Sequence, residues 1–197
     1  MNAGLSREEI RDRREALPSS RELVYLNHAA IAPLPSPSVR AMAELADRVS
    51  RTGDRRWPER NEMTERVRGL AAHLMGASRP ETVAFVPSTS AGLSLVAEGL
   101  DWNPGDNVVG AGCEFPSNVY PWMNLASRGV EYRQAEERDG RLDLDELEEL
   151  CDGRTRILAL SWVQYSNGFR TDLHRLGRFC RKNGILFVAD VIQGLGA

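Results

Sequence analysis

The sequence lacks several features that mark common classes of protein. It has a single lysine, Lys182, and its three cysteines stand far apart with no C-x-x-C pair, so no disulfide framework is indicated. We expect buried, reduced thiols and no metal site. Lysine and arginine together number 25 against 28 acidic residues, without a basic block or an acidic tail. This charge pattern argues against a nucleic-acid partner and favours a small molecule.

Long apolar segments are also missing. The first 20 residues are polar and charged where a secretory signal would be apolar, and no run approaches the length of a membrane span. We therefore expect a cytoplasmic protein with no membrane contact. Internal repeats are absent as well, and a content of 42% hydrophobic and 27% charged residues is typical of a folded globular chain.

The sequence does contain an alternation of β-branched runs with helical periods. Apolar spacing near the N-terminus predicts helices over 7–16, 37–53 and 58–76, with Ser36 as the N-cap of the second and a proline-punctuated loop at 27–35. Further on, strands are predicted at 82–86, 107–111, 130–133, 156–161 and 185–189, alternating with helices at 89–100, 116–128, 143–151 and 173–182. Repeated units of this kind predict an α/β fold with a mainly parallel sheet and helices on both faces.

Such sheets bind ligands beyond the carboxyl ends of their strands, which directs attention to the loops there. Ser88, Thr89 and Ser90 join the first predicted strand to a helix. Hydroxyl groups and free N–H groups at a helix N-terminus suit a phosphate, although an ordinary helix N-cap is the alternative. The segment is neither a Gly-x-Gly-x-x-Gly fingerprint nor a P-loop, which disfavours a nucleotide-dependent dehydrogenase or transferase.

Two more strand ends carry residues suited to a planar, cationic ligand. Phe115 follows strand 107–111, where its ring could lie against another ring or pack in the core. Asp190 ends the hydrophobic strand before it, where its carboxylate could pair with a cationic ring nitrogen or cap a helix. We expect these residues to converge with the hydroxyl-rich turn.

Five segments extend this pattern over almost the whole chain beyond residue 22: YLNHAAIAPLP, VPSTSAGLSLVAEGL, CEFPSNVYPW, LSWVQYSNGFRTDL and FVADVIQG. In content and order they resemble the motifs of the class V aminotransferase and cysteine desulfurase superfamily. The resemblance implies a fold-type-I large domain that binds pyridoxal 5′-phosphate (PLP). It also implies an amino acid as substrate and a homodimer as the assembled state.

The resemblance assigns roles to individual residues. Ser88, Thr89 and Ser90 would bind the cofactor phosphate. Phe115 would stack on the pyridine ring where relatives usually place histidine, Asp190 would keep the pyridinium nitrogen protonated, and Gln193 would donate a hydrogen bond to the phenolic oxygen. Phe115 and Asp190 would thus be the catalytic pair.

Other positions match the family less closely. Asn27 and His28 would lie on the substrate side, although His28 could also be a structural loop residue. Gln164 and Tyr165 replace a Ser-Asn pair that is common in desulfurases, and Phe115 lacks the proton-shuttling group of histidine. These departures favour an activity other than cysteine desulfuration.

Members of the superfamily hold PLP as a Schiff base on a lysine downstream of the aspartate. Lys182 does not match that position and is explained by the favourable placement of a cation at a helix C-terminus. We therefore expect an N-terminal part only, inactive as written: residues 1–36 as an N-terminal helix and substrate-side loop, and 37–197 as a partial PLP-binding large domain.

The expected activity of the parent is transamination, lysis of a bond at Cα or Cβ, or epimerisation of an amino acid. A non-catalytic α/β module that binds a phosphorylated ligand, or a truncated pseudoenzyme, is the alternative.

Overall fold

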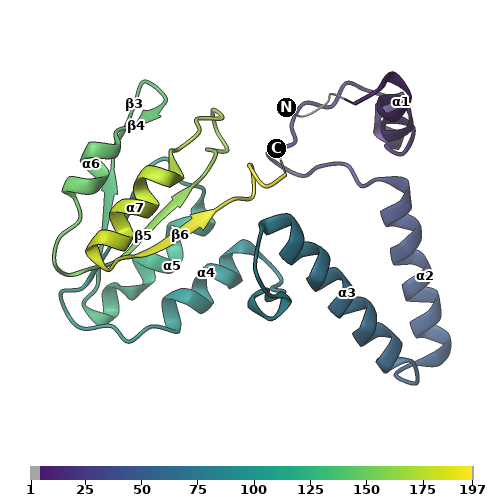
Figure 1. Cartoon of the computed structure of the whole chain (residues 1–197), viewed down its shortest axis with the longest axis horizontal. Coiled ribbons are helices and arrows are strands. Elements are labelled where there is room, and N and C mark those ends of the chain that lie inside the picture. The colour runs from purple at the N-terminus through teal and green to yellow at the C-terminus, as the bar shows by residue number, and fades with distance from the viewer. Residues whose placement is uncertain (1–4, 197) are drawn as a thin grey trace. The chain divides into compact units, whose positions relative to one another are not determined.

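The computed structural model describes residues 5–196 and separates into two compact units, Met1–Pro80 and Glu81–Ala197 (Figure 1). The first unit is helical and the second contains the sheet. The division predicted at residues 36 and 37 remains a prediction.

The first unit confirms the three predicted helices, as α1 (Arg7–Glu15), α2 (Ser36–Thr52) and α3 (Trp57–Met75). A capping box begins α1, because Ser6 Oγ accepts a hydrogen bond from the Glu9 N–H and the Glu9 carboxylate accepts one from the Ser6 N–H. Helix α2 begins one residue earlier than predicted, so that Pro35 and not Ser36 is its N-cap. Helix α3 ends at Gly76 in the left-handed conformation.

The second unit contains a four-stranded sheet in the order β2-β1-β5-β6 in which every pairing is parallel. This confirms the predicted parallel sheet. Its strands are β1 (Asn107–Ala111), β2 (Glu131–Ala135), β5 (Thr155–Ser161) and β6 (Leu186–Asp190). The helices are α4 (Thr89–Glu98), α5 (Tyr120–Met123), α6 (Leu144–Glu149) and α7 (Leu173–Asn183).

Helices cover both faces of this sheet, because successive strand residues point to opposite sides. Val108 and Ile157 pack with residues of α4 and α5 in one core cluster, whereas Val109 and Leu158 pack with residues of α6 and α7 in the other. The two clusters fix the strands between them and so place the strand ends at one edge.

Two further predictions of local structure are wrong, and one hairpin was not predicted. Residues 82–86 do not form a strand: a 3-10 turn, η2 (Pro80–Thr82), leads into an irregular segment. The β-branched residues there favour extended backbone, but a strand also needs a ladder, and the ladders of the sheet join only β1, β2, β5 and β6 among the described residues.

The predicted helix 116–128 is divided into η3 (Pro116–Asn118), α5 and η4 (Asn124–Arg128). Proline fits only the first turn of a helix, so the helix restarts around Pro121. A hairpin of β3 (Glu137–Arg138) and β4 (Arg141–Leu142) was not predicted. Its turn has positive φ at Asp139 and Gly140, as an Asp-Gly hairpin turn requires.

Candidate functional site

The carboxyl ends of β1, β5 and β6 lie at one edge of the sheet, because the three strands are parallel. Ser161, the last residue of β5, stands in register with Asp190, the last residue of β6. Glu114 and Phe115 follow closely after β1. The edge therefore gathers two carboxylates and an aromatic ring.

The hydroxyl-rich turn forms the N-terminus of α4. Ser88 is the N-cap, and its Oγ accepts a hydrogen bond of 3.1 Å from the Ala91 N–H. Thr89 and Ser90 lie in the first turn, where backbone N–H groups have no partner within the helix. Ser88 thus has the capping role that the sequence left open, and phosphate binding by the three residues remains a prediction.

Asp190 lies on the wall of a pocket of about 440 Å³ together with Thr89 and Gly92 of α4. The rest of the lining is apolar or backbone: Leu93, Ala189, Val191, Ile192 and Leu195. Asp190 is 8% exposed, and its Oδ1 accepts a hydrogen bond of 3.0 Å from the Ile192 N–H. Within residues 5–196 no cation pairs with it, and a buried carboxylate without a cation favours a positively charged ligand.

Phe115 is not a core residue, since half of its surface is exposed. Its ring meets the Tyr165 ring edge-on, with centroids 5.1 Å apart and planes at 85°. Gln193 lies half-buried in the turn that follows β6. The structure therefore brings Thr89 and Asp190 to one pocket and Phe115 to Tyr165, while neither Phe115 nor Gln193 belongs to the described lining of that pocket.

Glu114 is a buried residue that the sequence reasoning did not select. Only 5% of it is exposed, and its carboxylate accepts hydrogen bonds from Ser161, Gln164 and Asn118. The sequence signal was weaker than for Asp190, because two residues separate Glu114 from the end of β1 whereas Asp190 ends β6. The sequence reasoning selected Phe115, the next residue, instead.

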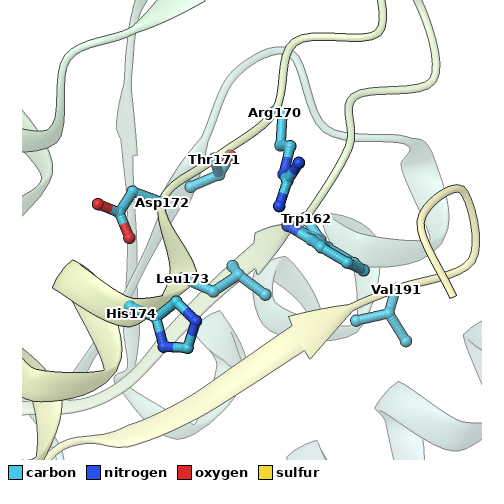
Figure 2. A pocket seen from close by; sticks show the side chains of 7 residues that line it. All are labelled: Trp162, Arg170, Thr171, Asp172, Leu173, His174 and Val191. Atoms are coloured by element: carbon cyan, nitrogen blue, oxygen red, sulfur yellow. The ribbon is translucent and has the colours of Figure 1, made fainter. Parts of the chain in front are cut away.

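A second pocket, of about 500 Å³, lies beside the start of α7 (Figure 2). Figure 2 shows the Arg170 side chain directed at the Trp162 ring, and its guanidinium carbon lies 5.2 Å from the ring centroid. Thr171 Oγ1 is buried there without a hydrogen-bond partner among the described residues. None of these three residues was predicted to form a pocket. The remaining lining residues are Asp172, Leu173, His174 and Val191.

Asn27 and His28 belong to the first compact unit, and both are exposed. The His28 ring contacts the Tyr25 ring edge-on at 5.1 Å, and the Tyr25 hydroxyl donates to the Ile31 carbonyl. His28 is therefore in contact with residues of its own loop, as expected for a structural loop histidine. A substrate role for the two residues remains a prediction.

Lys182 is exposed in the last turn of α7 and precedes β6, at the opposite end of that strand from Asp190. Burial raises the pKa of the Cys113, Cys151 and Cys180 thiols to about 11 in each case. Among residues 5–196, no three histidine, cysteine or acidic side chains are grouped to hold a metal ion. Within the same residues, none of the helices combines the length and the hydrophobicity that a membrane span requires.

Comparison with known proteins supplies an independent view. The sequence matches the family described as "Aminotransferase class-V" over residues 24–197. It is 32% identical over 190 residues to a "Probable cysteine desulfurase" of Methanothermobacter thermautotrophicus, covering 94% of this chain and 47% of that protein. A "Cysteine desulfurase" of Cronobacter sakazakii is 31% identical and covers 90% of this chain and 46% of its own length. The chain therefore spans about half the length of these relatives.

Solved structures show the same likeness over about half of their length. The cysteine desulfurase CsdA of Escherichia coli superposes with a TM-score of 0.81 at 27% identity, over 94% of this chain and 49% of that protein. A variant of the C-DES protein with glycine covalently linked to its PLP cofactor has a TM-score of 0.85, over 93% of this chain and 50% of that one. Its identity is 20%, so this second likeness shows the fold alone.

Proposed function

Because the chain belongs to the class V aminotransferase family, whose members depend on PLP, we propose that its carboxyl-edge pocket binds PLP for the transformation of an amino acid. The observation that carries the proposal is the pocket shared by Thr89 at the start of α4 and the buried Asp190 at the end of β6. Thr89 at the helix N-terminus suits a phosphate, and Asp190 suits a cation. PLP has both groups on one ring.

The residues present fit the cofactor. First-turn N–H groups and the hydroxyls of Thr89 and Ser90 offer donors to a phosphate at the positive end of the α4 dipole. Asp190 is buried and unpaired by any described cation, as the partner of a protonated ring nitrogen should be. A volume of about 440 Å³ is within the range of small-molecule sites.

PLP, when bound, supplies an electron sink that stabilises negative charge at the carbon being altered. The residues of this chain would bind and orient it. Asp190 would hold the proton on the ring nitrogen, Phe115 would cover one face of the ring, and Gln193 would donate to the phenolic oxygen. Water would be kept from the ring by the apolar lining contributed by Leu93 and Ile192.

The relatives bear the name cysteine desulfurase, but one feature supports a different reaction here. Phe115 has no ionisable group with which to move a proton. We therefore favour transamination, lysis at Cα or Cβ, or epimerisation. A cytoplasmic homodimer is the proposed setting, and light scattering of the purified protein tests the dimer.

Pyridoxamine 5′-phosphate provides a direct test, because it carries the same ring and phosphate and binds without a covalent bond to lysine. Titration followed by the fluorescence of this ligand should saturate. Pyridoxamine without the phosphate should bind at least about tenfold more weakly, since several charge-assisted hydrogen bonds are lost. Inorganic phosphate binding alone, with no preference for the ring, would favour the non-catalytic phosphate-binding module instead.

A further inference from the structure

Two pairs of neighbouring residues face each other across the carboxyl edge: Glu114 with Phe115 after β1, and Gln164 with Tyr165 after β5. The inner members are buried and joined, because Gln164 Nε2 donates to Glu114 Oε1 at 2.7 Å. The outer members are about half exposed and are joined by their edge-on ring contact. The buried hydrogen bond and the exposed ring contact therefore join the same two chain segments.

The Glu114 carboxylate organises its surroundings. It accepts four hydrogen bonds: 2.8 Å from the Ser161 N–H, 2.5 Å from Ser161 Oγ, 2.7 Å from Gln164 Nε2 and 3.0 Å from Asn118 Nδ2. Every donor is neutral, and no cation within residues 5–196 pairs with the carboxylate. A buried charge is tolerated only when it is fully hydrogen-bonded, so these donors have little freedom to turn away.

The orientation of the Gln164 amide shows that its hydrogen bond to Glu114 takes precedence over a partner for its own oxygen. Its nitrogen faces Glu114, whereas its Oε1 is buried without a hydrogen-bond partner among the described residues. Leaving a buried carbonyl oxygen unsatisfied is unfavourable. The bond to the charged carboxylate outweighs this cost, so Glu114 determines how the Gln164 side chain lies.

We propose that Glu114 is a positioning residue: by holding Gln164 it keeps Tyr165 against Phe115 and thereby fixes the ring that faces the cofactor. The inference rests on the proposed function, because that function gives Phe115 its role. Asn118 extends the same support, since it donates to Glu114 and its Oδ1 accepts from Trp122 Nε1 at 3.2 Å. The buried Trp122 anchors this chain of contacts in the core.

The test uses two variants that break the buried bond and one that does not. Glu114→Gln removes the charge and brings an amide nitrogen toward neutral donors, whereas Gln164→Ala removes the linking side chain and leaves the carboxylate in place. Asn107→Ala is the matched control, because Asn107 is a fully buried polar residue at the amino end of β1, the strand that Glu114 follows. Gln164→Ala keeps the test decisive should Glu114→Gln fail to fold.

The first measurement needs no ligand: nuclear Overhauser effects between the ring protons of Phe115 and Tyr165. They should be present in the wild type and in Asn107→Ala, and lost or strongly reduced in Glu114→Gln and Gln164→Ala. The second is the affinity for pyridoxamine 5′-phosphate, which should fall about three- to thirtyfold in the two edge variants, as expected for one displaced side-chain contact, and stay unchanged in the control.

The outcomes separate this inference from the proposed function. Retention of the ring contacts in both edge variants would overturn the positioning role, whatever the ligand does. Loss of the contacts with unchanged affinity would also overturn it, because the aromatic pair would then not serve the ligand. A wild type that keeps the ring contacts but binds no pyridoxamine 5′-phosphate would refute the proposed function itself, and with it the cofactor-facing role.

Discussion

The two ends of strands β1 and β5 are built from similar groups and differ in how their charges are balanced. At the amino end, Asn107 donates to Asp152 and accepts from the Thr155 hydroxyl, and Arg133 neutralises Asp152 at 2.7 Å. At the carboxyl end, Glu114 has a comparable set of neutral donors but no described cation.

Asp190, also at the carboxyl end, is likewise without a described cation. The amino end is therefore organised for stability, whereas the carboxyl end has two carboxylates without a described cation, of which Asp190 lines the pocket where a ligand can meet it. Functional sites commonly give up stability in this way.

The largest effect is expected from removing the charge at Asp190. Asp190→Asn should weaken binding of pyridoxamine 5′-phosphate about 10- to 100-fold, because a hydrogen bond to a charged group contributes roughly 1.5–3 kcal/mol. Folding stability measured by urea should stay equal or rise, since an unpaired buried charge is removed. If Asp190→Asn bound the ligand as tightly as the wild type, the carboxyl end of the sheet would have no ligand-binding charge to distinguish it from the amino end.

Asn107→Ala should give the opposite result. It removes the hydrogen bonds that the buried Asn107 side chain makes with Asp152 and the Thr155 hydroxyl, which should lower the free energy of unfolding by about 1–3 kcal/mol. Urea denaturation measures this loss, and ligand titration should show unchanged affinity. Weakened binding with unchanged stability would contradict the assignment of the amino end to stability.

The charge at the amino end also predicts a dependence of stability on pH. The hydrogen bond from Arg133, followed by that from the Arg154 N–H, holds the pKa of Asp152 well below its ordinary value of 3.8. A depressed folded-state pKa stabilises the protein above the unfolded value and ceases to do so as pH falls through the folded one.

Asp152→Asn should therefore be less stable than the wild type near neutral pH. The difference should shrink steadily as the pH falls below 3.8, the ordinary value for the carboxyl group. Chemical denaturation at a series of pH values tests this, and a difference that grows toward acid would contradict the role of Arg133. Asp139→Asn, the same change of residue type in the exposed hairpin turn, is the matched control.

The smallest effect concerns the three thiols. Because burial raises the pKa of all three to about 11, alkylation by iodoacetamide at neutral pH should be slow in the folded protein and fast in urea. Mass spectrometry of partly labelled protein identifies each site. Rapid labelling of Cys113 in the folded state would instead point to a reactive thiol near the carboxyl edge.

Much of this arrangement could be predicted from sequence because it depends on local pattern. The hydrophobic run of residues 107–111 and the apolar spacing of 173–182 define β1 and α7 by themselves. Asp190 was found because a carboxylate that ends such a run is unusual. The extended segment 82–86 was misjudged because a strand depends on a distant partner, which periodicity does not report.

Glu114 was missed for a related reason. Its importance depends on burial beneath residues from β5 and on the bond to Gln164, 50 positions away. Sequence alone shows an acidic residue next to a more suggestive phenylalanine. Similarly, Gln164 and Tyr165 were noted only as departures from a family pattern, whereas the structure shows that they touch Glu114 and Phe115.

The most direct test of the account is a backbone amide correlation spectrum recorded during titration with pyridoxamine 5′-phosphate. We predict saturable shifts in residues 88–92, at Phe115 and in residues 189–193, with the signals of Asn107 and residues 152–156 unmoved. Saturable shifts at the amino end, or no saturable shifts at all, would contradict the claim that the carboxyl edge is the cofactor site.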